Sequence, residues 1–144
     1  MRTRFVIEGF DDFDRNLALA SDLMRDRELV DPVLHDALAP VAEAARSIVP
    51  VRSGRLRDDI LVSDSAEDDR SDGDIVAYVG PSTDAFYAED VERGRPASVS
   101  ASGREYDATR PHPFMRPAWD QESDGILPAL GRGLGEMLKR KLKG

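Results

Sequence analysis

The side chains that could perform acid–base, nucleophilic or metal chemistry are few in this sequence and lie far apart. Among 144 residues there are no cysteines and two histidines, His35 and His112. The absence of cysteine excludes a disulfide framework, a thiolate metal site and a cysteine nucleophile. His35 lies in a stretch with helical periodicity and His112 lies between two prolines, so neither stands within a set of metal ligands or catalytic partners. We therefore expect no catalytic residue, no metal and no cofactor.

The motif that most suggests a metal is the acidic run DDRSDGD at residues 68–74. An EF-hand calcium loop that begins at Asp68 needs oxygen ligands at its third and twelfth positions. Those positions hold Arg70 and Val79. Because neither side chain offers an oxygen, the run is not an EF-hand loop.

Two pairs of neighbouring carboxylates leave a small carboxylate-dependent hydrolase as the weaker functional alternative. The pairs are Asp58 with Asp59, and Glu89 with Glu92. The first pair is expected on a strand, where adjacent side chains point to opposite faces. Nothing in the sequence buries either pair, so nothing separates their pKa values into those of an acid and a base.

Composition and net charge narrow the class of protein. The chain is 40% hydrophobic and 33% charged with a net charge of −8, which is typical of one globular domain with a highly charged surface. It has 19 aspartates to 9 glutamates and 17 arginines to 3 lysines. A halophilic host, whose salt screens a dense acidic surface, and a GC-rich host without high salt both explain this balance. The sequence lacks a signal-peptide pattern and a membrane-spanning run, which predicts assembly in a host cytoplasm.

Charge is unevenly distributed along the chain. Residues 58–92 carry twelve acidic residues and one arginine, whereas residues 132–144 carry a net charge of +4. Such runs often form solvated faces, and a basic last turn complements a helix dipole. The functional alternative is that the basic end of one copy contacts the acidic face of another. Under that alternative, the expected contact residues are Glu89, Asp90, Arg93, Lys139, Arg140 and Lys141.

Hydrophobic periodicity predicts three helices. The first covers residues 10–24, where apolar residues recur at spacings of three and four. The second is expected to begin at Asp31–Pro32, with the acid as its cap, and to continue to residue 48 with a kink or split at Pro40. The third is expected from Pro117 onward, weakened or bent by Pro128 and several glycines.

The remaining segments predict a small sheet and a loop. Strands are expected at residues 4–9, 56–63 and 74–80, the last two joined as a hairpin. Residues 85–94 fit either a helical turn or a short strand, and residues 95–110 predict a long mobile loop. The fold class is therefore α+β: a small, mostly antiparallel sheet packed against N-terminal helices and a C-terminal helix. We expect one domain over residues 1–144, with segments 1–29, 30–94, 95–111 and 112–144.

The segment RPHPFMRPAW, residues 110–119, combines three prolines with large apolar side chains. Prolines fix φ and remove backbone donors, so this spacing suits neither a helix interior nor a central strand. It predicts a stiff, mostly extended arm that crosses the sheet. Phe114 and Met115 are expected to enter the core, and Pro117 to be the first residue of the last helix.

Three stretches occur in an order that resembles one family. They are AARSIVPVRSGRLRDDI (44–60), YVGPSTDAFYAEDVERGRP (78–96) and HPFMRPAWDQ (112–121). They are similar to the pattern P-v-x-[ST]-G-x-L-[RK]-x-x-I, then Y-A-x-x-x-E-x-G, then P-F-[ML]-R-P-A. Together they resemble the HK97 gp10-like family of tailed-virus proteins, over roughly residues 30–125. Serine stands at Ser53 where threonine is commoner in the family, and Arg93 stands where an aromatic residue is frequent.

The resemblance and the residues themselves give the same structural roles to the motif positions. The Ser53–Gly54 pair is expected to end the second helix, and the Gly80–Pro81 pair to end the second strand in a turn. Glu92 is expected to bind nearby backbone donors or to reach a neighbouring copy. The residues with expected structural roles are Pro50, Ser53, Gly54, Leu56, Ile60, Gly80, Tyr87, Glu92, Gly94, Pro113, Phe114 and Pro117.

The resemblance implies a structural virion protein rather than an enzyme. Copies would form an oligomeric ring, sixfold by resemblance, at the neck of a tailed virus of bacteria or archaea. The ring would complete the tail and join it to the head connector. Its partners would be an adaptor or head-closure protein, the tail terminator and the tail tube, with no membrane and no specific nucleic acid. An acidic DNA-mimic inhibitor is the alternative, which the acidic stretch at 58–92 favours and the basic tail opposes.

Overall fold

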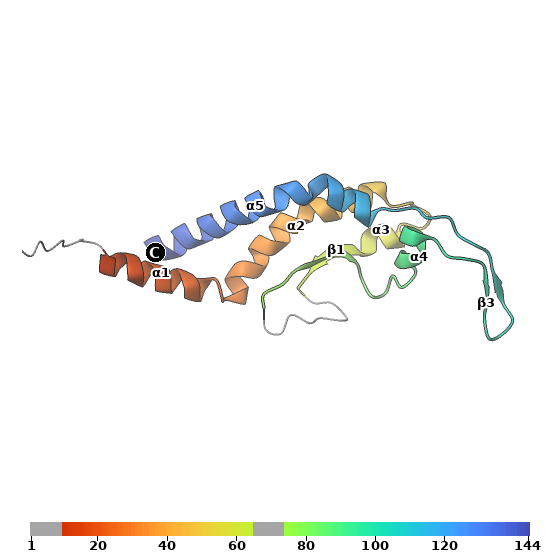
Figure 1. The fold of residues 1–144 in the computed structure, drawn as a ribbon, viewed down its shortest axis with the longest axis horizontal. Coiled ribbons are helices and arrows are strands. Elements are labelled where there is room, and N and C mark those ends of the chain that lie inside the picture. Colours follow the sequence, from red (N-terminus) through yellow and green to blue (C-terminus); the bar gives the residue numbers. More distant parts are fainter. Residues whose placement is uncertain (1–9, 65–73) are drawn as a thin grey trace, which may run out of the picture.

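The computed structural model describes residues 10–64 and 74–144, which form an elongated α+β structure (Figure 1). The expected strand at 4–9 and most of the expected hairpin connection lie outside the described residues. The helices are α1 (Phe10–Leu23), α2 (Arg27–Ile48), α3 (Arg55–Asp59), α4 (Ala88–Arg93) and α5 (Met115–Lys143). The strands are β1 (Ile60–Ser63), β2 (Tyr78–Pro81), β3 (Ser98–Val99) and β4 (Glu105–Tyr106).

The two long helices, α2 and α5, pack side by side and carry the rest of the fold (Figure 1). Small residues allow the close approach, because Ala45 and Ala118 are fully buried between them. Nearer the other end, a Cβ on Gly133 of α5 would lie 2.5 Å from Cγ1 of Val33 on α2. A side chain at position 133 would therefore displace the Val33 side chain, which favours glycine at this crossing.

Helix α2 begins at Arg27, so the expected start at Asp31–Pro32 is wrong. Asp26 is the cap, and its carboxylate accepts a hydrogen bond from the backbone amide of Glu28 at 3.0 Å. Pro32 thus lies inside the helix, as does Pro40, and neither splits it. Each proline removes one backbone hydrogen bond, but the buried face between Val30 and Ala45 holds the helix together.

The main sheet has two antiparallel strands, β1 and β2, which pair Ile60 with Pro81 and Val62 with Val79. The expected strand at 56–63 is half wrong, because residues 55–59 form the short helix α3. The amide of Asp58 donates a hydrogen bond to the carbonyl of Gly54 at 3.0 Å, and this bond closes the helical turn. The second expected strand is also shorter than residues 74–80, since β2 begins at Tyr78.

Residues 95–110 contain regular structure, although they were expected to form a loop. The strands β3 and β4 pair in an antiparallel hairpin, which continues in a bridge between Arg95 and Thr109. The Ser100 hydroxyl accepts a hydrogen bond from the amide of Arg104 at 3.0 Å and closes the turn. Strands of two residues carry no detectable periodicity, which explains why the sequence did not reveal them.

Helix α5 begins at Met115, two residues before the expected start. Pro117 still lies in its first turn, where a helix needs no backbone donor. Pro128 lies inside α5, which continues to Lys143. None of the helices among residues 10–64 and 74–144 combines the length and apolarity that a membrane span requires.

The core lies where α2, α3, β1, α4 and the start of α5 meet. Phe114 and Ile60 are its largest fully buried side chains in this region, at 1% and 0% exposure, and Leu56 lies beside them. Met115, Tyr87 and Val91 are partly buried against the same cluster. The expected burial of Phe114, Leu56 and Ile60 in the core is confirmed. Met115 was expected there as well but is only partly buried.

A candidate interaction surface around the start of helix α5

The carboxylate of Glu92 binds the first backbone amides of helix α5. Its Oε2 accepts from the amides of Phe114 at 2.7 Å and Met115 at 3.0 Å, and its Oε1 accepts from the amide of Arg116 at 3.1 Å. Helix α5 has no side-chain cap of its own at Phe114. Glu92, on α4, therefore caps it from 22 residues away in sequence. This is the first of the two roles that the sequence predicted for Glu92.

The environment of Glu92 holds it as an anion. Partial burial raises its pKa, but the hydrogen bonds from the amides of Phe114, Met115 and Arg116, together with the charge of Arg93, outweigh burial and lower the pKa below 4.5. The positive end of the α5 dipole acts in the same direction. A carboxylate held in this way cannot serve as a general acid near neutral pH.

The proline arm is fixed beside the end of α4 by backbone contacts. Gly94 has a φ of 76°, and a Cβ there would lie 2.7 Å from the carbonyl oxygen of Thr109 and 2.9 Å from Pro111. The amide of His112 donates to the carbonyl of Val91 at 2.7 Å. Gly94 is thus required twice, for its left-handed conformation and for the close approach of the arm.

The other motif residues surround the same core. Gly54 has a φ of 82° and precedes α3, so it does not end α2, which ends six residues earlier at Ile48. Ser53 accepts from the amide of Arg55 at 3.5 Å. Gly80 lies within β2 opposite Leu61, and the strand ends at Pro81, as expected for the Gly80–Pro81 pair. Pro50 and Pro113 line surface grooves, and Pro117 lies in the first turn of α5.

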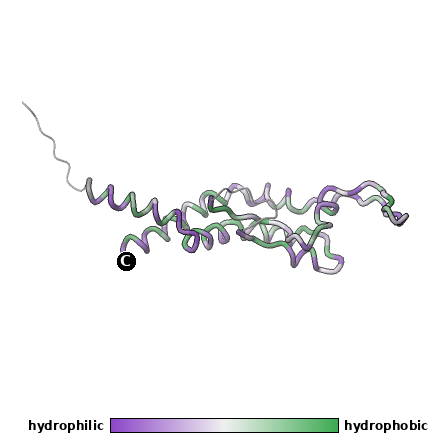
Figure 2. The backbone as a smooth tube through the Cα atoms, turned by 90° about the horizontal axis from the view of Figure 1, so that it is seen from below, coloured by the Kyte–Doolittle hydropathy of each residue, from purple (hydrophilic) through white to green (hydrophobic). Residues whose placement is uncertain are grey.

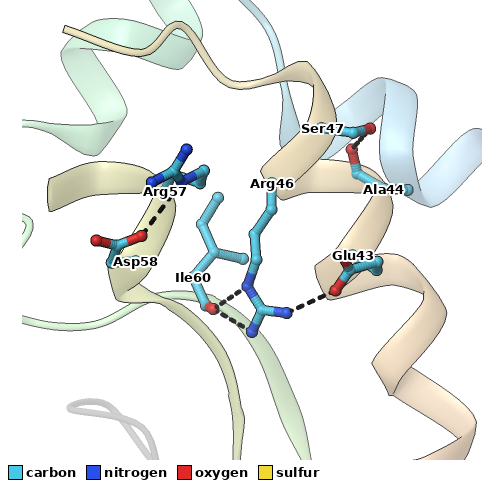
Figure 3. A network of polar contacts seen from close by, with 7 residues as sticks. All are labelled: Glu43, Ala44, Arg46, Ser47, Arg57, Asp58 and Ile60. Atoms are coloured by element: carbon cyan, nitrogen blue, oxygen red, sulfur yellow. Dashed lines mark hydrogen bonds and ion pairs between the residues drawn. The ribbon is translucent and has the colours of Figure 1, made fainter. Parts of the chain in front are cut away.

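An arginine that the sequence analysis missed joins α2 to β1. Arg46 donates from Nε and Nη2 to the carbonyl oxygen of Ile60, at 3.0 and 2.7 Å (Figure 3). Its Nη1 also donates to Glu43 at 3.0 Å. The Ile60 carbonyl follows α3 directly, so Arg46 fixes the point at which the chain leaves the helix and enters the strand. A single arginine in a helix gives no sequence signal for such a contact.

The expected subunit-contact residues lie at two separate ends of the molecule. On α4 and just after it, Arg93 pairs with Glu89 at 2.8 Å and Arg95 pairs with Asp90 at 3.2 Å. Their contact with a second copy stays a prediction. The basic residues Lys139, Arg140 and Lys141 lie at the opposite end of α5. There, Arg140 and Lys141 line a groove together with two acidic residues of α2 in the same chain, Glu28 and Asp36.

The carboxylate pairs do not form an acid–base site. Asp58 and Asp59 lie at the end of α3 rather than on a strand, and Asp58 pairs with Arg57 at 3.2 Å. Glu89 and Glu92 have separate partners, as described above. Across residues 10–64 and 74–144, no group of three or more potential metal ligands comes together. The acidic run at 68–74 falls almost entirely outside the described residues.

The structure also gathers arginines that are distant in sequence. A groove of about 810 Å³ lies between the loop after α2, α4 and residues 109–112. It is lined by Arg52 and Arg55, which follow α2 in the sequence, and by Arg95 and Arg110, which flank the β3–β4 hairpin. About forty residues separate the two pairs, so the sequence gave no indication of the cluster.

Comparison with known proteins identifies the family. The family model described as "Bacteriophage HK97-gp10, putative tail-component" matches residues 11–94, more than half of the chain. The match includes the Ser53–Gly54 and Tyr87–Gly94 motifs and ends before the proline arm, whose resemblance to the family stays a prediction. No curated protein and no solved structure matches the chain. The chain therefore belongs to the HK97-gp10-like family of bacteriophage proteins.

Proposed function

We propose that this protein is a structural, non-enzymatic component of a phage tail, located in the virion. Copies form an oligomeric ring at the neck, which completes the tail and joins it to the head connector. The observation that carries the proposal is the family match over residues 11–94, since the family is described as a tail component. The ring is sixfold by resemblance, and its other partners are an adaptor or head-closure protein, the tail terminator and the tail tube.

The structural roles of the motif residues support a protein that acts by shape. Glu92 caps α5, Gly94 admits the proline arm, and Tyr87 packs against the core. Side chains that serve the fold in this way are not available for turnover. The arginine-lined groove also opposes the acidic DNA-mimic alternative, because a DNA mimic presents carboxylates to its target.

The distribution of apolar side chains supports burial in an assembly. Several large hydrophobic residues remain strongly exposed, including Phe86 at 88%, Leu127 at 78% and Val51 at 60%. They are distributed along the elongated molecule, on the loop before α4, on α5 and after α2. Single exposed hydrophobic residues are ordinary, but surfaces on several sides suit a subunit with neighbours on each of them.

Inactivation of the gene in the phage genome that encodes the chain tests this proposal. Electron microscopy of the resulting particles should show filled heads and separate tails that are not joined, and a wild-type copy supplied in trans should restore joined particles. Normal numbers of joined, infectious particles without the protein would contradict the proposal.

A further inference from the structure

The arginine-lined groove carries an excess of positive charge on a chain whose net charge is −8. Arg95 pairs with Asp90, the one acidic residue lining the groove, and its Nε is buried without an acceptor among the described residues. The guanidinium groups of Arg52, Arg55 and Arg110 form no hydrogen bond or ion pair with any described residue. A protein of net charge −8 thus presents three unpaired guanidinium groups around one groove.

The inner wall of the groove defines what kind of ligand would fit. Leu56, Tyr87 and Val91 line the same groove and supply its apolar surface. Guanidinium groups bind carboxylates through two parallel hydrogen bonds, and the apolar wall can cover hydrocarbon side chains next to them. The groove therefore suits a protein segment that carries carboxylates next to apolar residues. The net negative charge of the chain opposes a nucleic-acid ligand.

A segment of this chemistry lies at the other end of the same chain. Figure 1 shows α1 beside the C-terminus, whereas α3 and α4 lie at the opposite end of the long helices. Along α1, hydrophobic and hydrophilic residues alternate (Figure 2). Asp14 and Asp22 are exposed and form no ion pair with any residue that the structure describes, and Leu17 is 58% exposed. Asp14 and Leu17 are three residues apart and so are neighbours on the surface of α1, and Asp22 lies about two turns beyond Asp14.

We propose that the arginine-lined groove of one copy binds helix α1 of a second copy. Asp14 and Asp22 would pair with the free arginines of the groove, and Leu17 would contact its apolar wall. The two surfaces differ and lie at opposite ends of the molecule, so each copy offers one of each. Such a head-to-tail contact repeats from copy to copy. It closes into a ring when the rotation between successive copies divides a full turn. The inference rests on the proposed ring and specifies which surfaces of neighbouring copies meet in it.

Charge reversal on the full-length protein tests the contact. One variant carries Arg52→Glu and Arg110→Glu, and the other carries Asp14→Lys and Asp22→Lys. Analytical ultracentrifugation at low ionic strength should show that the wild-type protein self-associates and that added salt weakens the association. Each variant alone should associate about tenfold more weakly or worse, because like charges then meet across the interface. An equal mixture of the two variants should recover association, since each supplies the charge that the other needs.

Matched controls separate the contact from folding and from general charge effects. Arg132→Glu and Asp124→Lys change the same kinds of exposed residue on α5 and should leave association unchanged. Circular dichroism establishes that each variant keeps the wild-type helix content. If the groove variant does not fold, Arg52→Gln with Arg110→Gln takes its place. It should weaken association, and its mixture with the Lys variant should form pairs through the one intact groove and the one intact α1 without larger assemblies.

Three results would overturn the inference: a wild-type protein that stays monomeric at high concentration, variants that associate like the wild type, or a mixture of the two Glu and Lys variants that does not recover. A fluorescent oligonucleotide that binds the wild type but not the groove variant, with self-association unaltered, would instead assign the groove to phosphate. If the mixture of the Glu and Lys variants does not recover association while the protein is still found in purified particles, only the proposed contact is refuted. Absence from particles would refute the proposed function itself.

Discussion

Replacing Glu92 by alanine should destabilise the protein more than any other change of an exposed or half-buried carboxylate on α4. The substitution leaves three amides at the start of α5 without their acceptor, and two of them, on Phe114 and Met115, are partly buried. Water can reach the third, on Arg116. The loss also frees the start of α5 from α4, since this carboxylate joins the two helices.

The expected magnitude follows from the hydrogen bonds that are lost. Loss of an N-terminal cap costs about 0.5–2 kcal/mol, and hydrogen bonds to charged groups contribute about 1.5–3 kcal/mol. Because Glu92 is half-buried and water replaces part of its role, we expect Glu92→Ala to lower the free energy of unfolding by about 2–3 kcal/mol. For a chain of this size, the Tm should fall by about 6–9 °C.

The control for this prediction is Glu89→Ala on the same short helix. Glu89 is exposed and, among the residues that the structure describes, pairs only with Arg93, so its loss should cost less than about 0.5 kcal/mol. Urea and thermal unfolding of the two variants beside the wild type provide the comparison. If Glu92→Ala and Glu89→Ala unfold at the same denaturant concentration, the capping role of Glu92 is refuted.

The same carboxylate predicts a pH dependence. The folded-state pKa of Glu92 lies below its ordinary value of 4.5, so the unfolded state binds the proton more readily. Its contribution to stability is therefore fully present above pH 4.5 and is lost as the pH falls through the lower, folded-state value. The difference in unfolding free energy between the wild type and Glu92→Gln should shrink over that acidic range and stay constant above it. A difference that grows on acidification would contradict the assigned direction of the shift.

Three further substitutions test the packing around the proline arm. Gly94→Ala should cost at least about 1 kcal/mol more than Gly103→Ala, because both glycines have a positive φ but only Gly94 meets backbone atoms within 3 Å; equal costs in urea unfolding would refute the close approach. Phe114→Ala should cost about 3–5 kcal/mol, and a fluorescence-monitored unfolding curve that matches the wild type would place this ring outside the core. Arg46→Met should cost about 1–3 kcal/mol by leaving the buried carbonyl of Ile60 without its donor, and an unchanged Tm would show that this link is not needed.

The parts of the fold that the sequence revealed are those with long or chemically distinctive patterns. The periodicity of α1 and the apolar residues of the proline arm led to correct positions for the first helix and for Phe114. Glycine at position 54 indicated a positive φ, which the structure has at 82°. The role of Gly54 was predicted wrongly, because a residue with a left-handed conformation can either end one helix or precede the next.

The features of the fold that could not be predicted from the sequence depend on contacts between distant segments. Asp26 and Asp31 are both suitable helix caps, and the sequence alone does not show that Val30, between them, is buried within α2. Strand residues 98–99 and 105–106 are too few to show alternation. Arg46 and the four arginines of the groove have partners or neighbours that tertiary structure alone brings together. Their charge was visible in the sequence, but their convergence was not.

Cross-linking mass spectrometry of purified particles tests the central claim most directly. The measurement detects this chain in the virion, gives its copy number relative to known head and tail proteins, and identifies the residues that lie near a second copy. The account predicts that the protein is present in several copies, with cross-links between copies and to neighbouring neck or tail proteins. Purified, infectious particles that lack the chain would contradict it.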